Sequence, residues 1–451
     1  MAEKTVTLES TLAALAEGKK YAAVRGILIT MNPVDVAALF EELDETLLPL
    51  LFRLLPKELA AETFVEMDSD SQALLITGFS DTELKEVVDE LFVDDAVDLV
   101  EEMPANVVKR ILRQADPDMR RMINEILRYP DDSAGSIMTT EFVDLGPTMT
   151  VEDAEKRIRR TGVDKETINT CYVTDVGGHL IGTLSIRTIL LSNLDDVIQG
   201  IMEPNVISIE TTEDQEAVAQ KFGKYGFTSM PVVDKENRLV GIVTVDDALE
   251  VLQEEATEDI EKMAAITPSD RPYMKMGVLQ LWAARIPWLL LLMISATFTG
   301  LIISHFESAL AAYVALTMYI PMLMDTGGNS GSQSSVTIIR GLSLGELGLP
   351  DLPRILWKEL RVAGLCGVTL AAVGFLKFMF FDRVGLLVAF TVSFTLVLTV
   401  LVAKLVGCSL PLLAKKIGFD PAVMASPFIT TIVDALALLI YFRIATSLLG
   451  L

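Results

Sequence analysis

An aspartate lies inside an otherwise apolar stretch near the end of the chain. Asp434 interrupts the sequence SPFITTIVDALALLIYF, and no basic residue stands within one helical turn of it. A charged side chain at the centre of a bilayer costs about 2.5–3.5 kcal/mol on insertion scales, and such acids usually mark ion paths. A structural ion pair, or a protonated acid bonded to a neighbouring helix, is the alternative. Because no basic partner is near in sequence, we predict that Asp434 lies on an ion path.

A second polar feature lies upstream in a similarly apolar setting. Residues 321–335, PMLMDTGGNSGSQSS, directly follow the apolar run AAYVALTMYI. Close helix packing through small residues would explain the glycines and serines, but it leaves Asn329 and Gln333 unexplained. We expect the backbone to leave regular helix here, and at membrane depth such backbone survives only when buried in protein or lining a wet cavity. The stretch is therefore predicted to border a water-filled cavity.

The elements that carry these residues are apolar stretches after Pro287, long enough to cross a bilayer, which takes about 20 helical residues. Buried core helices of a soluble protein are the alternative. The run FTVSFTLVLTVLVAKLVGCSLPLL is too long and too uniformly apolar for that interpretation. We predict five spans, at about 281–304, 309–342, 362–381, 385–409 and 427–449.

Charge divides the 451 residues into two unlike parts. Residues 1–270 hold 54 acidic and 24 basic side chains, whereas residues 271–451 hold 8 and 13. This division predicts an acidic cytoplasmic head on a membrane domain, and it argues against a nucleic acid partner, whose phosphates would be repelled. The first residues, MAEKTVTLES, lack the pattern of a signal peptide, which also favours a cytoplasmic head.

Basic residues near the spans predict the orientation, because cytoplasmic connections are enriched in Lys and Arg. With the head inside, the expected outer connections hold only Lys377 and Arg383, and Arg443 lies near the outer end of the last span, so the C-terminus is expected outside. The expected cytoplasmic connections hold Arg340, Arg354, Lys358, Arg361, Lys404, Lys415 and Lys416.

Cysteine and histidine are too sparse for a zinc or copper centre. Cys171, Cys366 and Cys408 are scattered, and the only histidines are His179 and His305. Any metal site must therefore use oxygen ligands, which favours hard cations such as Mg²⁺ or Ca²⁺. A catalytic interpretation is weak for similar reasons, since the chain has no Gly-x-x-x-x-Gly-Lys loop and no Ser/His arrangement. We expect no enzyme activity.

Pairs of acids recur at helical spacing in the acidic part. Asp94 and Asp98, Glu254 and Glu258, and Glu255 and Asp259 would each share a helix face, where like charges are destabilising. A solvated acidic face is the ordinary explanation for any single pair. The net charge of −30 over residues 1–270 implies strong self-repulsion, however, which divalent cations bridging the carboxylates would relieve.

Residues 32–127 repeat with a period of twelve. Most of the units, from NPVDVAALFEEL to DPDMRRMINEIL, open with Asn, Asp, Ser or Pro and close on apolar residues. Those opening residues favour helix starts. A period of twelve fits no continuous coiled coil, so we predict short helices stacked into an all-α superhelical solenoid.

Two similar β-β-α units follow from about residue 137. CYVTDVGGHLIGTLSIRTIL and SMPVVDKENRLVGIVTVDDALEVL each predict a strand, a turn, a glycine-containing strand and a helix. They resemble CBS domains, which pair and often bind adenine nucleotides. In that family a Thr/Ser-x-x-Asp after the second strand commonly holds phosphate and ribose. The second unit has Thr244 and Asp247 at this spacing but the first has Ser185 and Thr188, so at most one nucleotide site is expected, with ATP as a modulator.

Taken together, the polar stretch, the intramembrane Asp434 and the linker EEATEDI resemble the MgtE family of magnesium channels over essentially the whole chain. The resemblance implies a multidomain protein with an all-α solenoid, an α/β tandem CBS pair, a linking helix and a five-helix transmembrane domain. The expected boundaries are 1–133 for the helical N domain, 134–199 and 200–252 for the two CBS domains, 253–278 for the linking or plug helix, and 279–451 for the pore domain.

The same resemblance implies a homodimer in the cell (inner) membrane, embedded in the lipid bilayer, with a Mg²⁺ pore between the subunits. The pore would be lined by Asp434, Gly328, Asn329, Ser332, Ser426 and the carbonyl of Thr430, with Asp420 in the loop before the last span. Mg²⁺ bound to the cytoplasmic acids would hold the gate closed. Those regulatory acids would be Asp94, Asp98, Asp214, Glu216, Asp247, Glu250, Glu255, Glu258 and Asp259.

Four positions depart from the family pattern, and two other functions stay open. Ser332 and Ser426 stand where some members have asparagine, and Gly226 and Glu250 stand where some have aspartate. Selectivity and the number of sensor ions are therefore less firmly implied than the overall function. One alternative is a broader path for Co²⁺, Mn²⁺ or Ca²⁺, or a coupled carrier. The other is a membrane-tethered Mg²⁺ or nucleotide sensor, which would not need the intramembrane Asp434.

Overall fold

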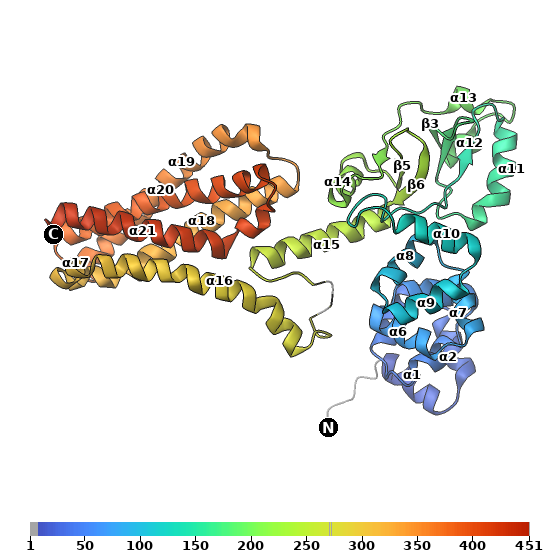
Figure 1. Ribbon diagram of the computed structural model, residues 1–451, viewed down its shortest axis with the longest axis horizontal. Coiled ribbons are helices and arrows are strands. Elements are labelled where there is room, and N and C mark those ends of the chain that lie inside the picture. Colours follow the sequence, from blue (N-terminus) through green and yellow to red (C-terminus); the bar gives the residue numbers. More distant parts are fainter. Residues whose placement is uncertain (1–7, 270, 272, 451) are drawn as a thin grey trace. The chain divides into compact units, whose positions relative to one another are not determined.

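The first part of the chain is an array of short helices. In this computed structural model, which describes residues 8–269, 271 and 273–450, the array precedes a pair of small sheets (Figure 1). Its helices are α1 (Leu8–Glu17), α2 (Tyr21–Leu28), α3 (Pro33–Glu41), α4 (Leu48–Phe52), α5 (Lys57–Val65), α6 (Ser69–Gly78), α7 (Asp81–Val88), α8 (Val93–Glu102), α9 (Ala105–Gln114) and α10 (Pro117–Ile126). The helices from α5 to α10 begin every twelve residues, so the predicted helical repeat is confirmed, whereas its superhelical course stays a prediction.

Side-chain caps explain why several of the repeats begin a new helix where they do. The Asn32 side chain accepts the Val34 N–H at 3.1 Å, and Asp68 accepts from Asp70 at 3.1 Å. Ser80 and Glu83 form a reciprocal capping box at the start of α7. These bonds satisfy backbone donors that an isolated helix end leaves free.

The tandem β-β-α units are also present, and each gains one very short strand that the sequence did not indicate. In the first sheet, β1 (Asp144–Leu145) runs parallel to β2 (Thr170–Thr174), which is antiparallel to β3 (Leu180–Ser185). In the second, β4 (Ile209–Glu210), β5 (Ser229–Val233) and β6 (Leu239–Thr244) repeat the same order. The accompanying helices are α11 (Val151–Thr161), η1 (Gly162–Asp164), α12 (Ile186–Leu191), α13 (Ile198–Ile201) and α14 (Gln215–Tyr225).

The two sheets are joined by matching contacts. The hairpin tips pair through Leu180 N–H to Asn237 O at 3.0 Å and Leu239 N–H to Gly178 O at 3.0 Å. The hydroxyls of Tyr172 and Ser229 are hydrogen-bonded at 2.9 Å between the sheets. Apolar side chains of α1–α10 and of the second sheet form one continuous core, so residues up to Leu252 make a single compact unit.

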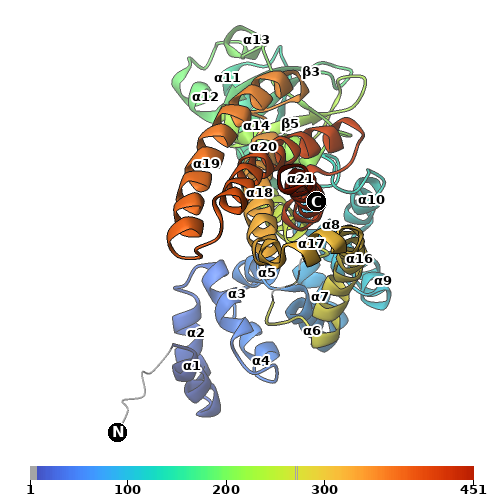
Figure 2. The ribbon, with the colours of Figure 1, turned by 90° about the vertical axis from the view of Figure 1, so that its left-hand side faces the viewer.

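The second compact unit covers residues 253–451. The linking helix α15 (Val245–Met263) begins before this unit and differs in both bounds from the expected segment 253–278. The helices that follow are α16 (Val278–His305), α17 (Glu307–Ala312), η2 (Val314–Tyr319), α18 (Ile320–Ser343), η3 (Leu349–Asp351), α19 (Leu352–Phe380), α20 (Leu386–Lys416), η4 (Pro421–Met424) and α21 (Ser426–Leu449). In the turned view α18, α20 and α21 lie side by side (Figure 2).

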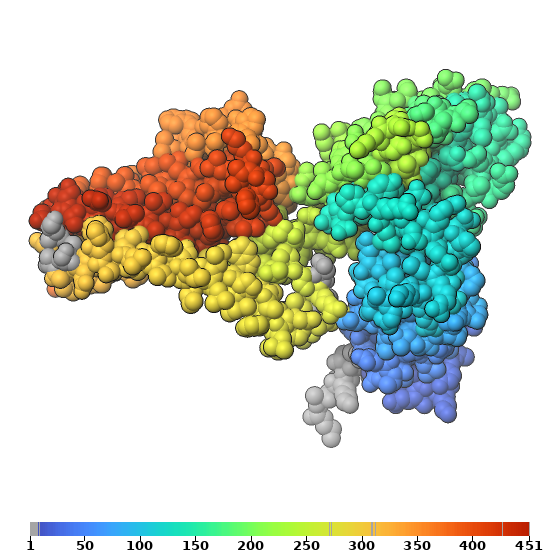
Figure 3. Space-filling view, in the orientation of Figure 1, coloured from blue at the N-terminus to red at the C-terminus, as the bar shows by residue number. Residues whose placement is uncertain are grey.

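Four of the described segments are long and apolar enough to cross a membrane: Val278–His305, Leu349–Phe380, Leu386–Lys416 and Pro421–Leu449. The 24 residues of α18 would extend about 36 Å, but its polar residues keep it out of this set. The count of five spans therefore stays a prediction. α16 packs along α21 on one side, and its other side is uncovered in the space-filling view (Figure 3).

Two expectations about this unit are wrong. The glycine-rich stretch does not leave regular helix, because α18 is continuous from Ile320 to Ser343 and packs closely on α20 and α21. Lys404 does not lie in a cytoplasmic connection, because it falls within α20 and is only 5% exposed. Tertiary packing explains both differences. The small residues of α18 stay helical because they let its backbone approach neighbouring backbones, and Lys404 stays inside the bundle because it has polar partners there.

The crossing of α18 and α20 predicts a strict size limit at Gly407. A Cβ atom there would lie 2.2 Å from the carbonyl oxygen of Gly331. We expect Gly407→Ala to lower the free energy of unfolding by about 1–3 kcal/mol, because overpacking forces the helices apart. Gly364→Ala on α19 is the matched control, since a Cβ there has no atom within 4 Å. Thermal unfolding in detergent measures both, and equal melting temperatures for the two variants would contradict this packing.

Candidate functional site

The polar stretch and the last helix meet through small residues. A Cβ on Gly328 would lie 2.8 Å from Cγ2 of Thr430, and one on Gly327 would lie 3.0 Å from Cγ1 of Val433. Glycine at these positions lets the backbones of α18 and α21 approach each other. The structure thus brings together Gly328 and Thr430, two of the predicted pore residues.

Asp434 lies on α21 one turn beyond Thr430 and is half-buried. Its Oδ1 atom is buried and has no hydrogen-bond partner among the described residues. Leaving a buried carboxylate oxygen unpaired is unfavourable unless water or a cation approaches it. The expected alternative, a structural ion pair with a basic residue, has no support in the described contacts of Asp434.

The other predicted pore residues differ from one another in exposure and in their place in the fold. Asn329 is exposed on α18 and Ser332 is half-exposed. Ser426 is the first residue of α21, and its side chain lies outside the part of the chain that the structure describes. Asp420 caps η4 by accepting the Ala422 N–H at 2.8 Å, so it belongs to the end of the bundle near α15 rather than to the Asp434 region.

A second acid, which was not predicted from the sequence, lies in this region. Asp325 is exposed on α18, four residues before Asn329 and eight before Gln333, which is also exposed. The three side chains therefore follow one helix face. Asp325 is close enough to Asp434 for its charge to act on that carboxylate. Its position in MLMDTGG inside an apolar segment was the available signal.

A second group of acids forms where α8 meets the second sheet, all within the first unit. Asp94, Asp95 and Asp98 lie on α8, and Asp247 lies in the first turn of α15. Burial, and then the charges of Asp95 and Asp247, raise the pKa of Asp94 well above its ordinary value. Burial and Asp247 raise the pKa of Asp95 to about 7. Desolvation and the charges of Asp95 and Glu250 raise the pKa of Asp98 to about 8, although part of its side chain reaches solvent.

Two further members of this acidic group, Glu141 and Glu166, were not predicted. Glu141 accepts the Val93 N–H and the Thr139 hydroxyl, both at 3.0 Å, so it holds the start of α8. Burial raises its pKa. Desolvation and the charge of Asp95 raise the pKa of Glu166 to about 8. Both acids lie in connections between elements, where no helical spacing could indicate them.

The group suits a hydrated divalent cation better than a tightly enclosed one. Among the described residues, no three His, Cys, Asp or Glu side chains are arranged to hold a metal ion together. Mg²⁺ usually keeps several waters and binds through one or two carboxylates. The oxygen donors of the group are of the type that Mg²⁺ prefers. Asp214 and Glu216 lie elsewhere, at the start of α14, where Asp214 caps the helix.

A third polar cluster lies within the second unit, between the C-terminal part of α15 and the residue that precedes η4. Lys262 on α15 lies 2.6 Å from Oε1 of Glu258 and 2.7 Å from Oδ2 of Asp420. Desolvation lowers the pKa of Lys262, but its bonds to Asp420 and Glu258 outweigh this and raise it overall. Burial and the charge of Asp420 raise the pKa of Asp259 in the same cluster. Glu255 is half-buried one turn earlier on α15.

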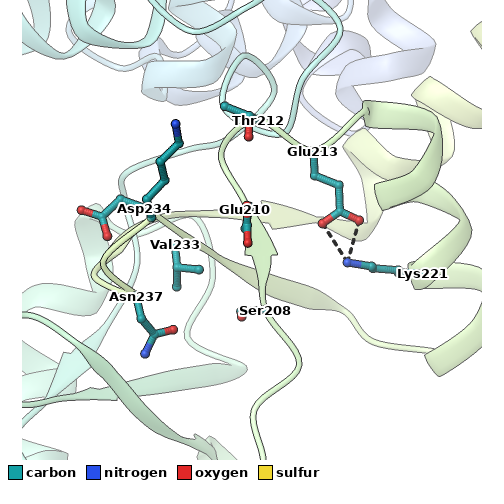
Figure 4. A pocket seen from close by; sticks show the side chains of 9 residues that line it. Ser208, Glu210, Thr212, Glu213, Lys221, Val233, Asp234 and Asn237 are labelled. Atoms are coloured by element: carbon teal, nitrogen blue, oxygen red, sulfur yellow. Dashed lines mark hydrogen bonds and ion pairs between the residues drawn. The ribbon is translucent and has the colours of Figure 1, made fainter.

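The second sheet carries a cavity of about 540 Å³ (Figure 4). Glu210, Asp234 and Asn237 line it, and Lys221 forms an ion pair with Glu213 at its side at 2.6 Å. Thr244 and Asp247, the predicted nucleotide residues, are not among its lining residues. Instead the Thr244 hydroxyl donates to Asp247 at 2.6 Å, which places that pair at the start of α15.

Family models match three regions of the chain. A model described as a divalent cation transporter, MgtE, matches residues 320–444, and one described as the MgtE intracellular N domain matches 31–132. The CBS domain model matches 134–195 and 197–254. The matched regions therefore include the polar stretch, Asp434 and the acidic group around Asp95, whereas Glu255, Glu258 and Asp259 of the Lys262 cluster lie outside them.

Relatives match over nearly the full length. The magnesium transporter MgtE of Thermus thermophilus is 40% identical over 440 residues, which cover 97% of each chain. The magnesium transporter MgtE of Bacillus subtilis is 33% identical over 94% of this chain and 93% of its own. The cytosolic domain of the Mg²⁺ channel MgtE in complex with ATP aligns with a TM-score of 0.52 and 37% identity, covering 54% of this chain and all of that one.

The raised pKa values predict how pH acts on the acidic group of Asp94, Asp95, Asp98 and Glu166. A carboxyl whose pKa is raised by folding holds extra protons in the folded state, so stability falls as pH rises from the unfolded value toward the folded one. Without divalent cations, we expect protease cleavage of residues 1–252 in the full chain to accelerate progressively as the pH rises from about 4 to about 8.

Millimolar Mg²⁺ should suppress this acceleration of protease cleavage, because the cation would neutralise the ionised carboxylates. The double variant Asp95→Asn/Asp98→Asn should show a flatter pH profile, whereas Asp118→Asn, at an exposed ion pair with Arg121, should not. A profile in the double variant as steep as in the wild type would contradict the assignment of the pH effect to this group.

Proposed function

This chain belongs to the MgtE family of divalent cation transporters, and on that premise we propose that it is a Mg²⁺ channel that admits Mg²⁺ to the cytoplasm. The ion would pass Asp434 in a pore at the interface of a homodimer. The observation that carries this proposal is the buried, unpartnered Oδ1 atom of Asp434 in a helix apolar enough to span a membrane. A hydrated dication is a partner that satisfies such an oxygen without a basic side chain.

The uncovered polar face of α18 supports a second subunit. Asp325, Asn329 and Gln333 are exposed within one chain, although the helix neighbours apolar segments. Lipid contact would be unfavourable for these groups. A second copy facing the first would enclose the two faces around water, and Gly328, Ser332, Ser426 and the Thr430 carbonyl would complete the lining. Small residues would leave room for the hydration shell.

We further propose that Mg²⁺ gates the pore through the acidic clusters. Cytoplasmic Mg²⁺ would bridge Asp94, Asp98, Asp247 and Glu250 in the head, Asp214 and Glu216 on α14, and Glu255, Glu258, Asp259 and Asp420 near α15. Loss of the ion would leave like charges facing each other and loosen the closed arrangement. The raised pKa values of Asp94, Asp95 and Asp98 support this repulsion.

ATP is proposed as a modulator of the CBS pair. The supporting observation is the similarity to an MgtE cytosolic domain solved with ATP. The cavity near Glu210 and Asn237 is one candidate place, and the pair Thr244 and Asp247 is the other.

The proposed setting is the cell (inner) membrane, with the N-terminal domains cytoplasmic and the C-terminus outside. Without Lys404, the cytoplasmic ends of the helices still hold more basic residues than the outer ends: Arg340, Arg354, Lys358, Arg361, Lys415 and Lys416, against Lys377, Arg383 and Arg443. A broader divalent selectivity is the second candidate, favoured by the family description as a divalent cation transporter and by Ser332.

The pore assignment predicts the behaviour of Asp434 variants. Asp434→Asn and Asp434→Ala should each lower Mg²⁺ uptake into vesicles by about tenfold or more, since a lost interaction of roughly 1.4 kcal/mol already gives that factor. Their thermal stability should not fall, because the change removes an unpaired buried charge.

Asp351→Asn, at an acid on η3, is the matched control and should transport normally. Competition with Co²⁺, Mn²⁺ and Ca²⁺ in the same assay measures selectivity. Undiminished Mg²⁺ uptake in both Asp434 variants would overturn the proposed pore.

The cluster at Lys262 predicts an effect on the closed state. Its ammonium links Glu258 and Asp420 without any metal, so Lys262→Met should raise channel open probability at micromolar internal Mg²⁺ by about threefold, as expected from a partly exposed ion pair. At millimolar Mg²⁺ the two freed carboxylates should bind the ion and restore closure. Recordings should show no change for Lys416→Met, an exposed cation at the end of α20. A wild-type response of Lys262→Met at both concentrations would contradict this role.

A further inference from the structure

Three polar side chains meet on the side of α18 that faces α19 and α20. The Ser334 hydroxyl donates to Oε2 of Glu359 at 2.7 Å, and the Lys404 ammonium donates to the Ser334 hydroxyl at 3.1 Å. Lys404 and Glu359 are 3.7 Å apart. Each residue comes from a different helix: Ser334 from α18, Glu359 from α19 and Lys404 from α20. We call this group the buried triad.

The buried triad is almost closed to solvent. Ser334 is 2% exposed, and the side chains of Lys404 and Glu359 are 6% and 16% exposed. Taking an ion pair out of water costs more than a well-packed apolar group of similar size, so buried pairs give little net stability. Ionisable groups in membrane helices accordingly tend to have functional roles. Stability alone therefore does not account for the triad.

The contacts of α18 next to the triad are mainly van der Waals contacts, which are less directional than its polar bonds. One turn away, Gly331 of α18 and Gly407 of α20 meet backbone to backbone. Glycines allow close approach, but they present no projecting side chain that prevents a helix from sliding or rotating. Ser335 adds one bond, from its hydroxyl to the Met424 carbonyl at 3.1 Å. The buried triad supplies the charge-assisted bonds at this crossing, which are stronger and more directional than neutral ones.

The triad is also coupled to the proposed pore face. Ser334 is buried at the back of α18, whereas Asn329 and Gln333 are exposed on the other side of the same helix. Rotation of a helix by one residue turns its side chains by about 100°. Such a rotation would carry Asn329 away from its present face and move Gly328 off Thr430.

We propose that Ser334, Glu359 and Lys404 are positioning residues that fix the height and rotation of α18, and thereby set the selectivity of the pore among divalent cations. This inference rests on the proposed function. The triad touches no part of the ion path itself and acts through Gly328 and Asn329.

The test compares selectivity in variants that leave no unpaired charge. Ser334→Ala removes the bond to α18 while Lys404 and Glu359 can still pair with each other. We expect the ratio of Mg²⁺ to Co²⁺ uptake in vesicles to fall by about tenfold, as for a lost hydrogen bond to a charged group. Thr395→Val is the matched control, because this fully buried hydroxyl donates only within α20, to the Thr391 carbonyl at 2.8 Å.

A second variant distinguishes a loss of selectivity from a loss of folding. Glu359→Met with Lys404→Met removes both charges together, and it should keep the wild-type elution volume and melting temperature while losing selectivity as Ser334→Ala does. Wild-type selectivity in both Ser334→Ala and the double variant would overturn the positioning role. Absence of Mg²⁺ uptake by the wild-type protein would instead overturn the proposed function, which separates the two failures.

Discussion

An ionised carboxylate inside a membrane bundle needs a partner, and the structure provides Asp434 with none among its described side chains. Its Oδ1 atom is buried without a hydrogen bond, and the nearby Asp325 adds a second negative charge. Protonation, water or a cation must then offset the free-energy cost of this arrangement, and the proposed function assigns that role to a hydrated cation. The proposed ion path, the facing subunit and the selectivity of the pore all depend on that requirement.

Close backbone contact makes the arrangement possible. Because residues 327, 328 and 331 are glycines, α18 lies so close to α20 and α21 that a Cβ atom at any of these positions would collide with a neighbouring atom. The glycines themselves contribute no side chain to these contacts. The hydrogen bonds of Ser334 and Ser335 restrain the position of α18. In the first unit, the proposed role of the cation differs, because it would neutralise the mutual repulsion of the acids around Asp95. In the proposed function, one unit would use a cation to satisfy a buried charge, and the other would use one to remain compact.

Sequence patterns predicted the features that depend on local chemistry. The twelve-residue repeat indicated α5 to α10 because helix-start signals, such as the caps Asp68 and Ser80, act within a single turn. Asp434 was identified because its apolar context is contiguous. Long-range contacts were not predictable in this way: Glu166 and Asp325 join their clusters through tertiary folding, and Lys404 was misplaced because its partners lie 45 and 70 residues away. The α18 helix persists through its glycines because packing overrides helix propensity.

The most direct test of the central claim is a structure of the full chain in Mn²⁺, whose anomalous signal locates the ion. The expected result is a dimer with Mn²⁺ density on the twofold axis, next to the Asp434 carboxylates of both subunits and separated from them by water. A carboxylate that faces lipid, or that pairs with a basic side chain and has no ion nearby, would contradict it.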